Sequence, residues 1–260
     1  MTRLAPAFAA ARGRPALIPF VMAGDPDLDI TEAIVLALAE AGALAVELGI
    51  PFSDPVADGP VIQAAAERAR AAGATVARVL DLVRRLRTRT DVPLVLFSYF
   101  NPILNHGPER FARDAAQAGA DAVLTVDLPA EEADHLAPLL RDAGLDPIFL
   151  VAPTTSHARL AHIAAQASGF IYAVSRAGVT GAGGGAPGEV ARHLVERTRA
   201  VTRLPVAVGF GVSSAEEVRA VSAYADAVVV GSALVRALSD TPAGADHAAV
   251  ASEFLRRLRP

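Results

Sequence analysis

The sequence predicts a closed (β/α)8 barrel with extra short helices, and three observations lead to this fold class. Eight short apolar runs alternate with Ala/Leu/Arg/Glu-rich segments of helical period. The runs are continuously apolar rather than alternating, as expected for parallel strands that are buried on both faces. The length of 260 residues is usual for one such barrel. The alternative for the same alternation is a doubly wound open sheet.

The elements follow from this pattern in order. The apolar, β-branched runs are the expected strands, at Ala16–Val21, Ala43–Leu48, Leu94–Ser98, Ala122–Val126, Pro147–Val151, Phe170–Val174, Val206–Val208 and Ala227–Val230. The segments of helical period are the expected helices, at Ile30–Ala41, Ile62–Ala72, Val76–Arg87, Glu109–Ala118, Glu131–Ala143, His157–Gln166, Gly188–Arg199, Ala215–Ser222, Ser232–Leu238 and Ala245–Leu258.

Local signals support several of these boundaries. Gly42 and Gly119 each follow an expected helix, where a glycine commonly caps the C-terminal end. Ser213 followed by Glu216 resembles a capping box. No linker or shift of composition interrupts the chain, so we expect residues 1–260 to form a single barrel domain.

The composition excludes several classes of function. A net charge of −4 gives no indication of binding to nucleic acid or to an anionic membrane. The chain has no cysteine, which excludes disulfides and thiolate metal sites, and its six histidines show no metal-ligand spacing, so we predict no metal. All 24 basic residues are arginine, which excludes a lysine imine. No apolar run suggests a membrane span or a signal peptide, so we expect a cytoplasmic protein.

Two acids are placed where barrel enzymes carry their chemistry. Glu47 ends an apolar run, and Asp58 lies on the Pro/Gly/Ser loop that follows it. Catalytic groups of such barrels lie at the C-terminal ends of strands, so both acids can face one pocket and transfer protons at two points of one substrate. The alternative is structural: an ion pair with an arginine for Glu47, and turn chemistry for Asp58 in Asp-Gly-Pro.

Glycine-rich turns follow the last two expected strands. Gly209–Ser213 and Gly231-Ser232 let backbone N–H groups approach an anion, beside the N-terminus of a short helix at Ser232–Leu238. Barrels often bind phosphate at this place, which favours a phosphate site over glycines that only make tight turns. The glycine-rich segment Ser175–Gly185 is interpreted as a mobile lid in which Arg176 and Thr180 are the polar groups; the alternative is a disordered connector.

Four motifs, in chain order, resemble those of the tryptophan synthase α-subunit family: Pro19-Phe20 with Ala23–Pro26, Glu47–Pro60, Tyr172 with Ser175–Gly181, and Val208–Gly211. The resemblance covers nearly the whole chain. It implies a carbon–carbon lyase that cleaves indole-3-glycerol phosphate to indole and glyceraldehyde 3-phosphate by a retro-aldol reaction. Such a reaction needs neither an imine nor a metal, because the indole ring can act as the electron sink.

The resemblance also implies roles for individual residues. Glu47 would be the acid/base near C3 of indole and the glycerol hydroxyl, and Asp58 the carboxylate at the indole N–H. Thr180 would help hold Asp58 when the lid closes. Further substrate contacts are implied for Phe20 and Tyr172, and phosphate contacts for Gly181, Phe210, Gly211, Gly231 and Ser232. Phe97, Leu124 and Val174 match positions around indole, although barrel packing is the safer interpretation for Leu124 and Val174.

The same resemblance implies a partner. A β subunit that binds pyridoxal phosphate would receive the indole in an α2β2 hetero-tetramer, and this chain would carry no cofactor because it has no lysine to hold one. The loops around Asp54 and Asn101-Pro102 would face the partner. Alternatives are a stand-alone lyase that releases free indole, a barrel that mainly regulates its partner, and a sugar-phosphate isomerase, against which the Glu47–Pro60 motif speaks.

Overall fold

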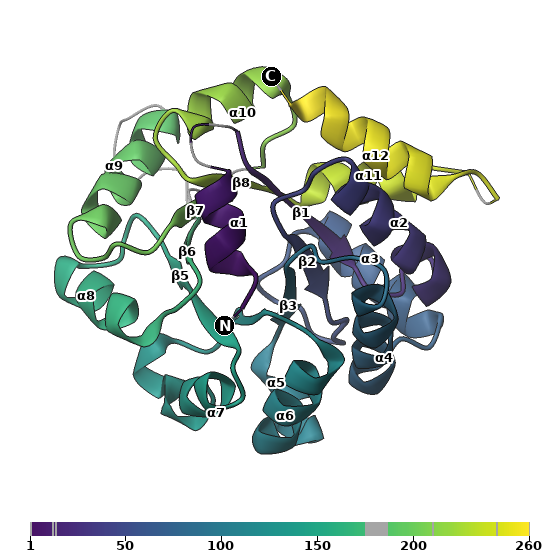
Figure 1. The fold of residues 1–260 in the computed structure, drawn as a ribbon, viewed down its shortest axis with the longest axis horizontal. Coiled ribbons are helices and arrows are strands. Elements are labelled where there is room, and N and C mark those ends of the chain that lie inside the picture. The colour runs from purple at the N-terminus through teal and green to yellow at the C-terminus, as the bar shows by residue number, and fades with distance from the viewer. Residues whose placement is uncertain are drawn as a thin grey trace.

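The structure is a computed structural model that describes residues 2–11, 13, 15–174, 187–209, 211–242 and 244–259. Eight parallel strands form a closed barrel in which each strand pairs with the next and β8 pairs with β1 (Figure 1). The strands are β1 (Leu17–Met22), β2 (Val46–Gly49), β3 (Leu94–Ser98), β4 (Ala122–Thr125), β5 (Asp146–Val151), β6 (Ile171–Val174), β7 (Val206–Gly209) and β8 (Ala227–Val230). The predicted fold class is therefore confirmed, and the doubly wound alternative is wrong.

Helices surround the barrel as an outer ring (Figure 1). They are α1 (Leu4–Ala10), α2 (Leu28–Glu40), α3 (Pro60–Ala71), α4 (Val76–Arg87), α5 (Phe100–His106), α6 (Pro108–Ala118), the 3-10 helix η1 (Ala130–His135), α7 (Ala137–Asp142), α8 (His157–Gln166), α9 (Pro187–Arg199), α10 (Ala215–Ser222), α11 (Ser232–Ser239) and α12 (His247–Leu258). In the described part of the chain, no helix is long and apolar enough to cross a membrane.

The structure corrects some helix predictions. The single helix expected at Glu131–Ala143 is divided into η1 and α7, because Leu136 has a non-helical backbone (φ −132°) and Pro138 restarts the helix in its first turn. The capping box of α10 is one residue later than expected: the Ser214 side chain accepts the Glu217 N–H, and Glu217 reaches back. The glycine caps are confirmed, since Gly42 and Gly119 have φ values of +84° and +94°.

Two helices were not expected from the sequence, α1 and α5. Helix α1 lies over the end of the barrel where the strands begin (Figure 1). Leu4 is fully buried there, and the rings of Phe8 and Phe170 are 5.7 Å apart. Both the backbone N–H and the guanidinium of Arg3 bind the buried carboxylate of Asp121, at 2.8 and 3.1 Å. This charge-assisted pair and the apolar contacts hold α1 across this end of the barrel.

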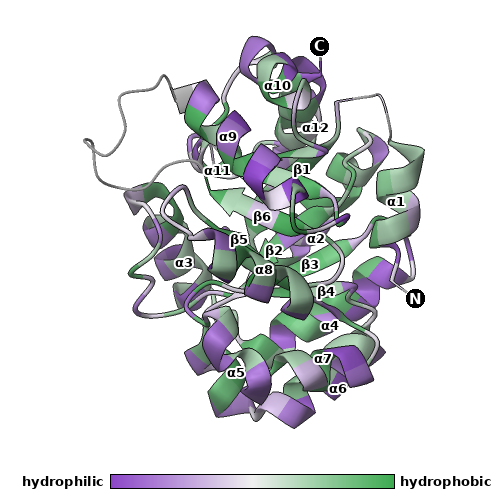
Figure 2. Cartoon of the chain, turned by 90° about the vertical axis from the view of Figure 1, so that its left-hand side faces the viewer, coloured by the Kyte–Doolittle hydropathy of each residue, from purple (hydrophilic) through white to green (hydrophobic). Residues whose placement is uncertain are grey.

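The core has two main layers. Strand residues that point outward pack against the helices, and inward residues such as Ile18, Val95 and Leu124 fill the barrel together with Phe8 of α1. Figure 2 shows hydrophobic strands inside and hydrophilic outer faces on the helices. A separate small cluster joins β1 with two helices, α3 and α11. Helix α3 begins next to the predicted acid loop, and α11 begins next to the predicted phosphate turn.

Candidate active site

Glu47 lies inside the barrel, with one carboxyl oxygen unpaired among the described residues. It pairs in register with Phe20 of β1 and Val95 of β3, and it is 1% exposed. Its Oε1 has no hydrogen-bond partner among the described residues. Burial raises the pKa of Glu47 to about 8, because the low-dielectric interior disfavours the charged form. Glu47 is therefore protonated at neutral pH and can donate a proton. The structural alternative of an arginine ion pair is not found in the described part of the chain.

Asp58 lies on the loop between β2 and α3, where backbone contacts fix its main chain. Its N–H donates to the Pro55 carbonyl (3.0 Å), and its own carbonyl accepts the Gln63 side-chain amide (2.9 Å). Partial burial raises the pKa of the Asp58 carboxyl to about 6, and the Tyr99 hydroxyl partly offsets this by favouring the carboxylate. Asp58 is thus mainly ionised at neutral pH, whereas Glu47 is not.

Tyr172 brings the two acids into one site. It lies on β6, and burial together with the charges of Glu47 and Asp58 raises the pKa of its phenol well above 10. Both acids are therefore close enough to Tyr172 to act on its phenol, although they come from different elements. Pairs of acids with pKa values pushed apart by their surroundings are typical of sites that use one as a proton donor and the other as an anion.

Gly209 on β7 provides the space for this tyrosine. A Cβ built at Gly209 would lie 2.7 Å from Cε1 and 2.8 Å from Cζ of Tyr172, which is far inside van der Waals contact. The ring thus lies directly against the β7 backbone. The sequence analysis assigned this glycine to the phosphate turn, and the contact with Tyr172 is a second reason for a glycine at this position.

Substitution of Gly209 with alanine is expected to displace Tyr172 and to destabilise the fold by about 1–3 kcal/mol, because the new Cβ would overpack against the Tyr172 ring. Urea unfolding measures the loss. Gly188→Ala is the matched control, because a Cβ there meets no atom within 4 Å and Ala suits a helix. Equal stability of the two variants would mean that the Tyr172 ring does not depend on Gly209.

An aromatic wall lines the β1–β3 side of the site. The rings of Phe20 and Phe97 meet edge to face, with centroids 5.1 Å apart. Gly49 makes this possible, since a Cβ there would lie 2.6 Å from Cζ of Phe20. Such a wall suits a flat apolar ring. Leu124 is fully buried in the interior cluster, as the packing interpretation expects.

The predicted phosphate turns lie at the same end of the barrel. Gly211 has a φ of +64°, and Gly231 is the N-cap of α11, which begins at Ser232. The N-cap glycine makes no side-chain hydrogen bond to this helix, and the first N–H groups of a helix are a suitable place for an anion. A Cβ on Gly231 would lie 3.7 Å from Cβ of Phe20, which places the turn beside the aromatic wall.

Four predicted site residues lie outside the described residues: Arg176, Thr180, Gly181 and Phe210. Their proposed contacts with substrate, phosphate and lid stay predictions. Tyr99, which is 3% exposed and acts on Asp58, was not predicted from the sequence. Its position directly after an expected strand, at the end where barrel chemistry occurs, was the available signal.

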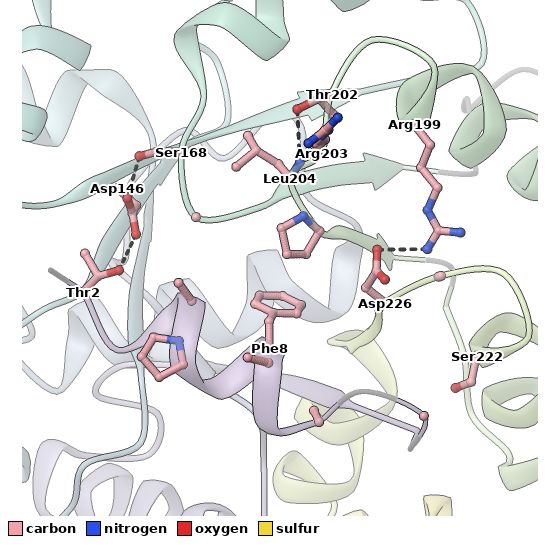
Figure 3. A pocket seen from close by; sticks show the side chains of 18 of the residues that line it. Thr2, Phe8, Asp146, Ser168, Arg199, Thr202, Arg203, Leu204, Ser222 and Asp226 are labelled. Carbon is pink, nitrogen blue, oxygen red and sulfur yellow. Dashed lines mark hydrogen bonds and ion pairs between the residues drawn. The ribbon is translucent and has the colours of Figure 1, made fainter.

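A cavity of about 1280 Å³ lies at the opposite end of the barrel, beneath α1 and the amino ends of β5–β8 (Figure 3). Two polar pairs lie in its wall: Arg199 binds Asp226 at 3.0 Å, and Ser168 donates to Asp146 at 2.6 Å, whereas Oγ of Ser222 has no hydrogen-bond partner among the described residues. It contains neither Glu47 nor Asp58. This end of a barrel typically serves stability rather than catalysis, so we place the candidate site at the mouth that holds the two acids.

Comparisons with known proteins agree with this geometry. The profile of the family described as "Tryptophan synthase alpha chain" matches residues 7–258. The tryptophan synthase alpha chain of Geobacter sulfurreducens is 53% identical over 238 residues, which is 91% of this chain and 90% of that protein. The corresponding protein of Gluconobacter oxydans is 50% identical and covers 93% of this chain and 90% of its own length.

Solved structures show the same relationship. Tryptophan synthase subunit alpha of Legionella pneumophila superposes with a TM-score of 0.92 at 35% identity, covering 100% of this chain and 97% of that one. A chain of the tryptophan synthase complex of Pyrococcus furiosus gives 0.85 at 37% identity and covers 94% and 98%. With this match in sequence along nearly the whole barrel, the chain belongs to the tryptophan synthase alpha chain family.

Proposed function

We propose that this chain is a carbon–carbon lyase that cleaves indole-3-glycerol phosphate to indole and glyceraldehyde 3-phosphate. The observation that carries the proposal is Glu47, a buried carboxyl that is protonated at neutral pH and whose Oε1 has no hydrogen-bond partner in the described part of the chain. Burying such a group costs free energy, which no hydrogen bond to Oε1 offsets among the described residues. Membership of the family supports the choice of substrate.

The chemistry divides between the two acids. Glu47 donates its proton to C3 of the indole ring, and the Asp58 carboxylate stabilises the positive charge that develops at the indole N–H. The Glu47 carboxylate then removes the proton from the glycerol hydroxyl. The carbon–carbon bond breaks, its electron pair returns to the ring, and glyceraldehyde 3-phosphate leaves. Glu47 ends the cycle protonated, so protons balance without an imine.

The other predicted residues hold the substrate. Phe20 and Phe97 provide the wall for the indole ring, and Tyr172 lies near both acids. For the phosphate we propose the N-terminus of α11 at Ser232 and the turns at Gly231 and Gly211. Thr180, Arg176, Gly181 and Phe210 retain their proposed contacts as sequence predictions.

A β subunit is the partner, and two exposed apolar residues mark where it would dock. Val56 on the Asp58 loop is 85% exposed, and Leu104 on α5 is 53% exposed. Both lie in the segments that the sequence analysis placed against the partner. Among the solved relatives is the α2β2 tryptophan synthase complex of Pyrococcus furiosus. No specific observation favours a stand-alone lyase.

Three further predictions stay proposals. We propose that this chain carries no cofactor of its own and that pyridoxal phosphate belongs to the β subunit, since the sequence has no lysine to hold it. The single-domain organisation over residues 1–260 and the cytoplasmic location also remain predictions from the sequence.

The pH dependence of kcat/KM is expected to be bell-shaped. Asp58 must be ionised, so activity falls as the pH drops through about 6, and Glu47 must be protonated, so activity falls as the pH rises through about 8. Initial rates across this range measure the profile. A kcat/KM that is flat through both values would contradict the assigned protonation states.

Product analysis tests the reaction itself. Purified chain incubated with indole-3-glycerol phosphate is expected to release indole and glyceraldehyde 3-phosphate in equal amounts, measured by chromatography with mass detection. Release of either product without the other would exclude a retro-aldol cleavage.

A further inference from the structure

Tyr99 is buried between two segments that border the site. It follows β3 directly and is 3% exposed. Its ring lies against Phe52 of the loop after β2, with centroids 5.3 Å apart. The next residue, Phe100, begins α5 and donates its N–H to Asp127 at 2.7 Å. Tyr99 is therefore held on both sides, and its hydroxyl has a fixed place.

The hydroxyl of Tyr99 points into the Asp58 loop. The N–H of Ala57 donates to it at 3.0 Å, so the oxygen already accepts one hydrogen bond. A phenol can donate one hydrogen as well, and the adjoining acceptor is the Asp58 carboxylate. The hydroxyl thus binds the backbone N–H of the residue before Asp58 and favours the charged form of the neighbouring Asp58 carboxyl.

The other supports of this loop act on its backbone. Gln63 donates to the carbonyls of Asp58 and Pro55, and the Asp58 N–H donates to Pro55. Among the described residues, the Tyr99 hydroxyl is the hydrogen-bonding group that acts on the Asp58 carboxyl itself. The remaining titratable neighbours are Tyr172, which faces both acids from β6 and feels the charge of Glu47, and Asp127, which faces Tyr99.

We propose that Tyr99 is a positioning residue for Asp58: its hydroxyl, fixed by the Ala57 N–H and by the ring contact with Phe52, holds the carboxylate toward the indole N–H. This inference rests on the proposed function for what Asp58 does, but the contact itself is independent of it. Asp58 stands on a loop with an exposed apolar tip, and a group held only through its backbone would sample several rotamers.

The test removes only the hydroxyl. Tyr99→Phe keeps the ring on Phe52 and is expected to lower kcat about 10-fold, with KM for indole-3-glycerol phosphate within a few-fold of wild type. The acid limb of kcat/KM is expected to move upward by about one pH unit, because the carboxylate loses a hydrogen bond that favours it. Tyr224→Phe is the matched control, since it makes the same change at the far end of the barrel and is expected to leave both quantities unchanged.

A second readout does not need activity. The Asp58 carboxyl, followed by carbon-13 NMR in the full chain, is expected to titrate at higher pH in Tyr99→Phe than in wild type. An unmoved titration and an unmoved acid limb would overturn the proposal, even if activity fell in step with stability. Wild-type chain that cleaves no substrate would contradict the proposed function, whereas the Asp58 titration would still decide the role of Tyr99.

If Tyr99→Phe does not fold, Phe52→Leu provides the second variant. It keeps the hydroxyl and removes the ring that supports Tyr99. The Asp58 titration is then expected to move in the same direction by a smaller amount. A titration identical to wild type would overturn the proposal.

Discussion

Replacement of Glu47 with glutamine is expected to lower kcat for indole-3-glycerol phosphate at least about 100-fold, with KM largely kept. Glutamine fills the same buried volume but has no proton to give to C3 and cannot accept one from the glycerol hydroxyl. Because these proton transfers occur only during the reaction, the loss is expected in kcat rather than in KM. Steady-state assays of indole release measure it.

Glu47→Gln is also expected to change how the free energy of unfolding depends on pH. The raised pKa of Glu47 contributes stability that is fully present below its ordinary value of 4.5 and is lost as the pH rises through about 8. Glu47→Gln lacks this loss. Its free energy of unfolding, relative to that of wild type, is therefore expected to increase as the pH rises from 4.5 to about 8. Glu253→Gln, on the surface of α12, is the control for both measurements. Turnover within a few-fold of wild type would remove Glu47 from the mechanism.

Replacement of Asp58 with asparagine is expected to nearly abolish turnover, by about 100-fold or more. The amide keeps the shape of the side chain but removes the negative charge that stabilises the protonated indole. The acid limb of kcat/KM should also disappear, because the group that titrates near pH 6 is gone.

Asp91→Asn is the control, because Asp91 is 99% exposed and pairs only loosely with Arg3 at 3.7 Å. It makes the same chemical change away from the two acids. Near-normal rates in Asp58→Asn would assign Asp58 to the turn that Asp-Gly-Pro forms, which was the structural alternative for this residue.

The sequence predicted the barrel well because its strands are buried on both faces. Continuous apolar runs such as Leu94–Ser98 and Ala227–Val230 need no tertiary information, and both coincide with observed strands. Glu47 could be placed for the same reason, since a carboxylate at the end of such a run must lie at the barrel mouth. That its Oε1 lacks a hydrogen-bond partner among the described residues could not be predicted, because this depends on side chains from other strands.

The remaining features depend on contacts between distant segments. The seven-residue helix α1 is too short to show a clear period, and it is held by Asp121, more than 100 positions away. Gly209 was assigned to an anion, whereas its packing against Tyr172 appears only when β6 and β7 lie side by side. Tyr99 was missed because its partner lies on a different loop.

The central claim is that two acids at the barrel mouth cleave indole-3-glycerol phosphate for a partner subunit. The measurement that tests it most directly is indole release by the purified chain, alone and with a tryptophan synthase β subunit, for wild type and Glu47→Gln. We expect weak release alone, a large rise with the β subunit, and almost none from Glu47→Gln in either case. Absence of indole from wild type in both conditions, or equal release by the two chains, would contradict the account.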